Sequence, residues 1–120
     1  MNTFTAIYCR VSKDEQEPEH QERELREYCA RRRWEHVRVF NDVISGPTDS
    51  RSALDQMLCD ARKGIVDNVV AVKLDRLGRS LIHLAHLFAE FDRMHIPIIC
   101  TSQGIDTSND NQPADFSARF

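Results

Sequence analysis

The stretch Val69-Val70-Ala71-Val72 decides the fold class of this chain. It is continuously apolar and mostly β-branched, and it is too short to be a typical helix. An unbroken apolar run of this kind is typical of a strand that is buried on both faces of a parallel sheet. The sequence therefore favours a central sheet whose strands are joined by helices.

The segments on either side of this run alternate between strand-like and helical patterns. Three further runs predict strands, namely Phe4–Val11, Val37–Phe40 and Ile96–Thr101. Three segments predict helices: Pro18–Arg33, a segment with Leu54, Met57, Leu58 and Ala61 on one face, and a segment striped by Leu81, Leu84, Phe88 and Phe91. We expect a turn-rich loop over Asn41–Ser50 and a mostly irregular segment over Ser102–Phe120. This alternation predicts an α/β domain with a mainly parallel central sheet flanked by helices.

The composition of the 120 residues indicates one globular domain, because 41% are hydrophobic and 29% are charged. Acidic residues (19) outnumber basic ones (16), so the formal net charge is −3 and bulk charge does not favour DNA binding. The four cysteines have no metal-ligand spacing and are expected to be reduced thiols. No apolar run approaches the ~20 residues that span a bilayer. We expect a cytoplasmic protein without membrane contact.

Two polar segments follow predicted strands, at the end of a parallel sheet where ligands bind. Tyr8, Arg10 and Ser12 are two residues apart, so an extended strand projects them to the same side. The segment Lys73–Arg79 contains three cations and one carboxylate, and a helical turn would place Arg76 and Arg79 on one face. We expect these two segments to lie together.

A set of fixed guanidinium groups suits the binding and orientation of a phosphodiester. If a serine attacks the phosphorus, the guanidinium groups would stabilise the extra negative charge without a metal ion. The ordinary alternative is that such arginines are solvated or paired with glutamates, and that a lone serine after a strand caps a helix. The spacing alone leaves both interpretations open.

Four motifs, taken together, resemble the catalytic domain of the serine recombinases, the resolvase/invertase family of site-specific DNA recombinases. They occur in the family's order and are Tyr8-Cys9-Arg10-Val11-Ser12, Asp42-Val43-Ile44-Ser45-Gly46, Lys73-Leu74-Asp75-Arg76-Leu77-Gly78-Arg79-Ser80 and Gly104-Ile105-Asp106-Thr107. The resemblance covers nearly the whole chain.

The resemblance implies a role for each residue at a matching position. Ser12 would be the nucleophile that forms a 5′-phosphoserine bond to DNA. The other implied catalytic residues are Arg10, Arg76, Arg79, Arg51, Asp75 and Gln21, and the implied supporting residues are Tyr8, Asp42 and Lys73. The family's reaction consists of two transesterifications and needs no metal ion and no cofactor.

The resemblance also implies double-stranded DNA as the partner, with a dimer and a synaptic tetramer in the full-length parent, and no small-molecule ligand. Family members continue into a long dimerisation helix, which would begin near Ser117–Phe120, and then into a DNA-binding region. We therefore expect residues 1–120 to be a catalytic domain that ends at the start of this helix and is inactive alone. Two alternatives are a metal-dependent nuclease that uses Asp42 and Asp75, and a non-catalytic interaction module.

Overall fold

The computed structural model describes residues 3–12, 19–44, 52–73 and 80–107. Within these residues, strands and helices alternate along the chain, as the sequence predicts. In chain order the elements are β1 (Phe4–Ser12), α1 (Glu19–Arg31), β2 (Val37–Ile44), α2 (Ser52–Arg62), β3 (Val66–Ala71), α4 (Leu81–Arg93), β4 (Ile98–Cys100), the 3-10 helix η1 (Thr101–Gln103) and β5 (Ile105–Asp106).

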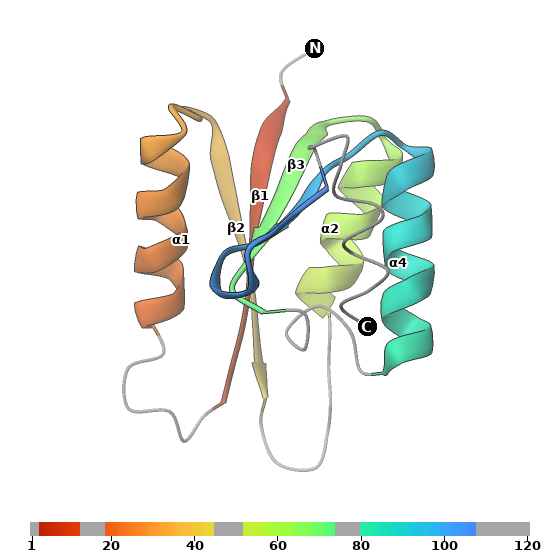
Figure 1. Ribbon diagram of the computed structural model, residues 1–120, viewed down its shortest axis with the longest axis horizontal. Coiled ribbons are helices and arrows are strands. Elements are labelled where there is room, and N and C mark those ends of the chain that lie inside the picture. Colours follow the sequence, from red (N-terminus) through yellow and green to blue (C-terminus); the bar gives the residue numbers. More distant parts are fainter. Residues whose placement is uncertain (1–2, 13–18, 45–51, 74–79, 108–120) are drawn as a thin grey trace.

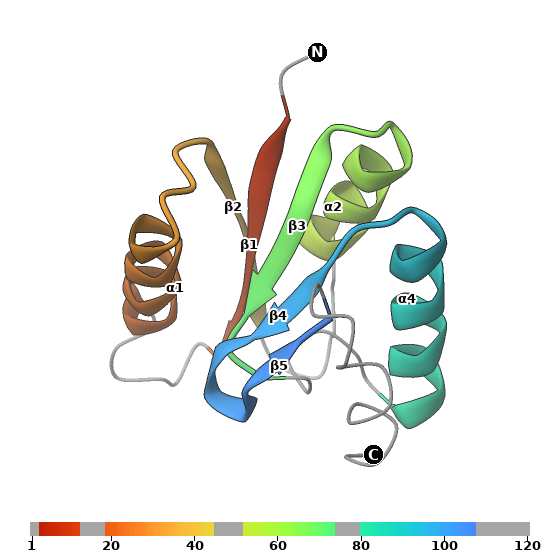
Figure 2. The same ribbon diagram turned by 45° about the horizontal axis from the view of Figure 1, so that its top comes forward.

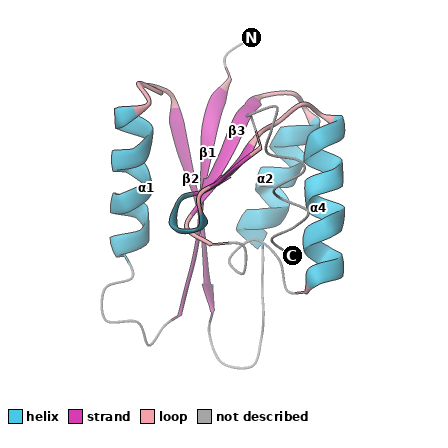
Figure 3. Cartoon of the chain, in the orientation of Figure 1, coloured by secondary structure: helices cyan, strands magenta, loops and turns pink. Residues whose placement is uncertain are grey.

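The strands form one sheet in the order β2-β1-β3-β4-β5. The pairs β1–β2, β1–β3 and β3–β4 are parallel, and only the short β5 pairs antiparallel with β4. Helix α1 lies on one face of the sheet, and α2 and α4 lie on the other (Figures 1 and 3). The predicted α/β fold with a mainly parallel sheet is therefore confirmed.

Two apolar layers hold the helices against the sheet. Ile7, Cys9 and Val70 point toward α1 and pack with its buried residues Leu25 and Cys29. The alternate residues of the same strands point to the opposite face, where the core contains Ala6, Tyr8, Val69, Ala71, Leu54, Met57, Leu87 and Phe91. Each strand therefore contributes to both layers, which explains the unbroken apolar run in β3.

Three expectations from the sequence are wrong in detail. β2 continues to Ile44, because it pairs with β1 over its whole length, so Asn41–Ile44 is strand rather than loop. β5 forms where irregular chain was expected, since Gly104 turns the backbone with a φ of 65° and Ile105 becomes buried. In α4, Leu87 is buried, whereas Leu81 is 58% exposed.

The sheet has a topological switch point between β1 and β3. The chain passes from β1 through α1 to β2 on one side, and then crosses through α2 to β3 on the other side of β1. The four parallel strands, β1 to β4, point downward in Figure 1, and each of the three helices begins at that same lower edge (Figures 1 and 2). Ligands of open α/β sheets bind at this place, outside the carboxyl ends of the strands.

Candidate catalytic site

The Tyr8-Cys9-Arg10-Val11-Ser12 motif forms the carboxyl end of β1, beside the switch point. Arg10 and Ser12 are the register partners of Asp42 and Ile44 on β2. Arg10 is half-buried, and strand alternation places it on the same face as Tyr8. Ser12 is the last residue of the strand, and the structure describes its backbone only. The sequence is therefore correct that this motif ends at the carboxyl edge of the sheet.

A buried hydrogen bond fixes Tyr8 to β2. The Tyr8 hydroxyl donates to Oδ2 of Asp42 at 2.7 Å. Tyr8 is fully buried and Asp42 is only 4% exposed. Tyr8 therefore packs in the core and orders the Asp42 carboxylate, while a role of either residue in a reaction stays a prediction.

The same carboxylate holds the beginning of α2. The backbone N–H of Ala53 donates to Asp42 Oδ1 at 2.9 Å, and the N–H of Leu54 donates to Asp42 Oδ2 at 3.1 Å. The first N–H groups of a helix have no partner within the helix, so a carboxylate there satisfies them and also favours the positive end of the helix dipole. Asp42 thus joins the carboxyl end of β2 to the first turn of α2.

Gln21 contacts the backbone of Arg10. Its Nε2 donates to the Arg10 carbonyl oxygen at 3.2 Å, and its Oε1 accepts from the Arg10 N–H at 3.4 Å. Gln21 is 9% exposed and lies on the buried face of α1. The amide group of Gln21 is therefore engaged with the peptide groups of Arg10.

The exit of β3 has its own contact, which sequence reasoning missed. Both the backbone N–H and the hydroxyl of Ser102 donate to the Val72 carbonyl oxygen, at 3.1 and 2.7 Å. Val72 directly precedes Lys73, which is exposed. The signal available in the sequence was the hydroxyl residue that follows the fourth predicted strand and precedes the turn at Gly104.

The remaining predicted site residues lie outside the described residues. These residues are Arg51, Asp75, Arg76 and Arg79. Arg51 directly precedes α2, whose first turn is fixed by Asp42, and the other three follow Lys73. The convergence of these side chains with Arg10 stays a prediction.

The cysteine within the motif, Cys9, has a buried thiol group. Cys9 is 2% exposed and packs in the layer between the sheet and α1. Burial raises the pKa of the Cys9 thiol to about 12. A thiol with this pKa is protonated at neutral pH and is a poor nucleophile.

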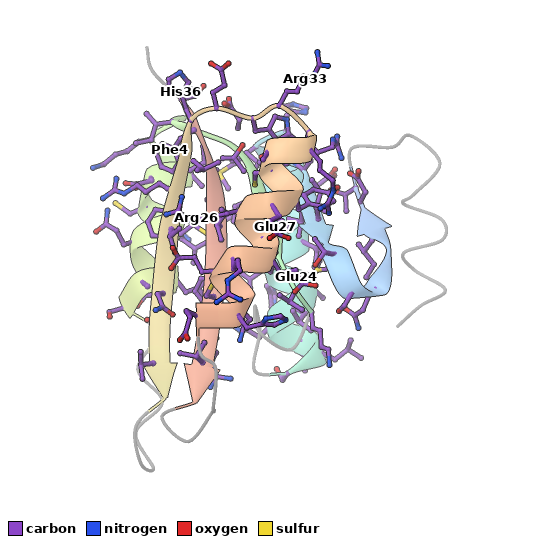
Figure 4. All side chains as sticks on the ribbon, turned by 90° about the vertical axis from the view of Figure 1, so that its left-hand side faces the viewer. Phe4, Glu24, Arg26, Glu27, Arg33 and His36 are labelled. Carbon is purple, nitrogen blue, oxygen red and sulfur yellow. The ribbon has the colours of Figure 1, made fainter. Side chains whose placement is uncertain are left out.

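In the described part of the chain, no group of three or more His, Cys, Asp or Glu side chains is arranged to hold a metal ion. No helix within the described ranges is long and apolar enough to cross a membrane. A hollow of about 430 Å³ is lined by residues that include Trp34, His36 and Asp67 and is separate from the candidate site. His36, which Figure 4 labels, directly precedes β2, so this hollow lies at the opposite, amino edge of the sheet.

Comparison with known proteins identifies the class to which this fold and site belong. The family described as "Resolvase, N terminal domain" matches residues 5–118. The fold is similar to the N-terminal catalytic domain of TP901-1 integrase, with a TM-score of 0.82, 28% identity, and coverage of 97% of this chain and 90% of that one. The chain belongs to the serine recombinase family, as its resolvase-type catalytic domain.

Two relatives from mobile elements and phages show the extent of the similarity. The chain is 32% identical to the transposon Tn3 resolvase of Escherichia coli over 103 residues, which are 86% of this chain and 52% of that protein. It is 36% identical to the serine recombinase gin of Escherichia phage Mu over 102 residues, which are 85% of this chain and 49% of that protein. The chain thus spans about half the length of each of these relatives.

Proposed function

We propose that this chain cleaves and rejoins double-stranded DNA in site-specific recombination, through a covalent bond between Ser12 and a 5′ phosphate. The observation that carries the proposal is the position of the motif. Arg10 and Ser12 end β1 at the carboxyl edge of the sheet, beside the switch point, in a chain of the serine recombinase family.

The proposed reaction conserves the number of phosphodiester bonds. The Ser12 oxygen attacks the phosphorus, the bond to the 3′ oxygen breaks, and the leaving strand takes a proton to become a 3′-hydroxyl. In the reverse sense, a 3′-hydroxyl from the exchanged strand attacks the phosphoserine and releases Ser12. Because each step replaces one ester with another, the reaction requires no high-energy cofactor, and we propose that arginine side chains take the place of a metal ion.

In the proposed reaction, cationic side chains stabilise the negative charge that develops on the phosphate. We assign phosphate binding to Arg10, Arg76 and Arg79, and to Arg51, which directly precedes α2 in the sequence. Preorganised donors aimed at the developing charge are worth several kcal/mol each in other enzymes, or roughly 10²–10³ in rate. Asp75 would orient these arginines, and Lys73, Asp42 and Tyr8 would support the arrangement.

The proposed partners follow from the reaction. Cleavage of both strands at two sites requires four copies of the catalytic domain, so we propose dimers on double-stranded DNA that join in a synaptic tetramer in the cytoplasm. The net charge of −3 gives this domain little general affinity for DNA, so site recognition would come from other residues of the protein.

The experiment that tests the function maps the covalent bond. The longest reading frame that contains this chain is expressed, and protein–DNA adducts are recovered under denaturing conditions, with and without a metal chelator. We expect an adduct on Ser12 that survives chelation and disappears in Ser12→Ala, while a control Ser52→Ala variant retains it. An adduct on another residue, or an undiminished yield from Ser12→Ala, would overturn the proposal.

A metal-dependent nuclease receives no support from Asp42. Both of its oxygens already accept hydrogen bonds, from the Tyr8 hydroxyl and from the backbone of Ala53 and Leu54, in a buried position. In the same experiment, cleavage by such a nuclease would stop with the chelator and would leave no adduct.

A further inference from the structure

β1 extends further than its neighbour β3 at the carboxyl edge of the sheet. Its pairing with β3 ends at Ile7 and Val70, whereas its pairing with β2 continues to Ser12 and Ile44. Among the strands that the structure describes, only β2 therefore lies beside the last residues of β1, which include Arg10. Such a strand end is prone to fray, because its backbone groups lack half of their ladder.

Gln21 lies beside Arg10 on the edge of β1 that β3 no longer pairs with. Since β2 still lies along the other edge of β1 at Arg10, the peptide groups that Gln21 bonds are those on the open side. One amide donates to the Arg10 carbonyl and accepts from the Arg10 N–H, which is the pair of bonds that a neighbouring strand would make. Among side chains of this length, only glutamine carries both a neutral donor and an acceptor on one planar group.

Helix α1 delivers this amide from a fixed position. Gln21 precedes Leu25 and Cys29 by four and eight residues, and all three are buried on the inner face of the helix. The exposed residues Arg26 and Glu27 lie on the outer side of the same helix (Figure 4). The amide is therefore held by the packing of α1 against the sheet.

We propose that Gln21 is a positioning residue, which replaces the missing strand at Arg10 and keeps the backbone from Arg10 to Ser12 extended. This proposal rests on the proposed function, and it gives Gln21 a role through the backbone instead of a contact with the phosphate. Extended backbone sets the Arg10 side chain and Ser12 on one side of the strand. A nucleophile displaced by about 1 Å can lose roughly 10²-fold in rate.

Hydrogen exchange of the Arg10 amide measures directly how well Gln21 protects the Arg10 N–H. Gln21→Met keeps the length of the side chain and removes both hydrogen bonds, and His20→Ala is the matched control at an exposed neighbour on α1. By NMR on the 120-residue chain, we expect the Arg10 amide to exchange at least about tenfold faster in Gln21→Met and at the unchanged rate in His20→Ala. Equal exchange in all three proteins would overturn the proposal.

The rate at which the Ser12 adduct forms is the second measurement. It uses a DNA duplex whose sequence is identified from the recovered adducts. We expect Gln21→Met to form the Ser12 adduct about 10- to 100-fold more slowly, with its Kd for the duplex within about twofold of wild type. A loss of affinity as large as the loss of rate would mean that Gln21 contacts the phosphate, and an unchanged rate would exclude a role in positioning. Either result would overturn the proposal.

A second variant guards against a folding defect. If Gln21→Met does not fold, Gln21→Leu is judged by the same criteria, because it also removes both hydrogen bonds to the Arg10 backbone. The two proposals also fail separately. If Ser12→Ala keeps its adduct, the proposed function is wrong, while exchange at Arg10 still decides whether Gln21 holds this backbone.

Discussion

The hydrogen bond between Tyr8 and Asp42 should be one of the largest single polar contributions to stability in this domain. Tyr8→Phe removes only the hydroxyl, which donates to the buried carboxylate at 2.7 Å. A hydrogen bond to a charged group contributes about 1.5–3 kcal/mol. For 120 residues the entropy of unfolding is about 0.25 kcal/mol/K, so this loss lowers the Tm by roughly 6–12 °C.

Thermal and urea unfolding, followed by far-UV circular dichroism, measure this loss. The matched control is Tyr28→Phe, because the Tyr28 hydroxyl accepts a hydrogen bond from Arg32 at the exposed surface. We expect the control to change the free energy of unfolding by less than about 0.5 kcal/mol. A double-mutant cycle with Asp42→Asn should show coupling between Tyr8 and Asp42. If Tyr8→Phe costs no more than Tyr28→Phe, the assignment of Asp42 as a buried anchor is refuted.

Two further predictions concern groups away from the proposed reaction. In the folded chain, Cys59 is exposed while the other cysteines are buried, so a thiol reagent at neutral pH should label Cys59 quickly and Cys9 only on unfolding. Mass spectrometry of the labelled peptides checks this, and rapid labelling of Cys9 would contradict it. The hydrogen bond from Arg62 lowers the pKa of the Glu90 carboxyl below its usual value of 4.5. Ionised Glu90 therefore stabilises the folded state above pH 4.5, and this stabilisation is lost as the pH falls through the lowered pKa. Urea unfolding of wild type and Glu90→Gln should therefore differ at pH 7 and converge at acidic pH, whereas a constant difference would refute this linkage.

The elements that sequence predicted best are those whose signal is local. Val69, Val70 and Ala71 of the apolar run and the strand from Phe4 lie in the sheet, because burial on two faces selects apolar residues at consecutive positions. The parallel direction of these strands follows from the alternation with helices, whereas the strand order comes from the structure. The placement of Arg10 at the carboxyl edge required nothing more than this alternation.

The extension of β2 illustrates what sequence could not predict. Asn41 and Asp42 are residues that favour turns, so the segment after Phe40 reads as a loop. In the structure Asp42 is a buried strand residue, because Tyr8 and the first turn of α2 satisfy its carboxylate. These partners are 34 and 11 residues away in the chain, respectively, and only the folded arrangement brings them to Asp42.

The three strand ends that lead into the implied catalytic residues share one physical arrangement. In each, a side chain links the strand end to another element: Gln21 of α1 binds the backbone of β1, Asp42 of β2 binds the start of α2, and Ser102 binds the carbonyl oxygen that follows β3. The arginines that the proposed reaction brings together would repel one another before DNA binds, so the backbone that carries them needs anchors of its own. Two of the three anchors act through uncharged peptide groups, and the third uses its charge on a helix start. None of these hydrogen bonds involves a guanidinium group, so in the proposed reaction these anchors would not compete with the phosphate for the positive charge of the arginines.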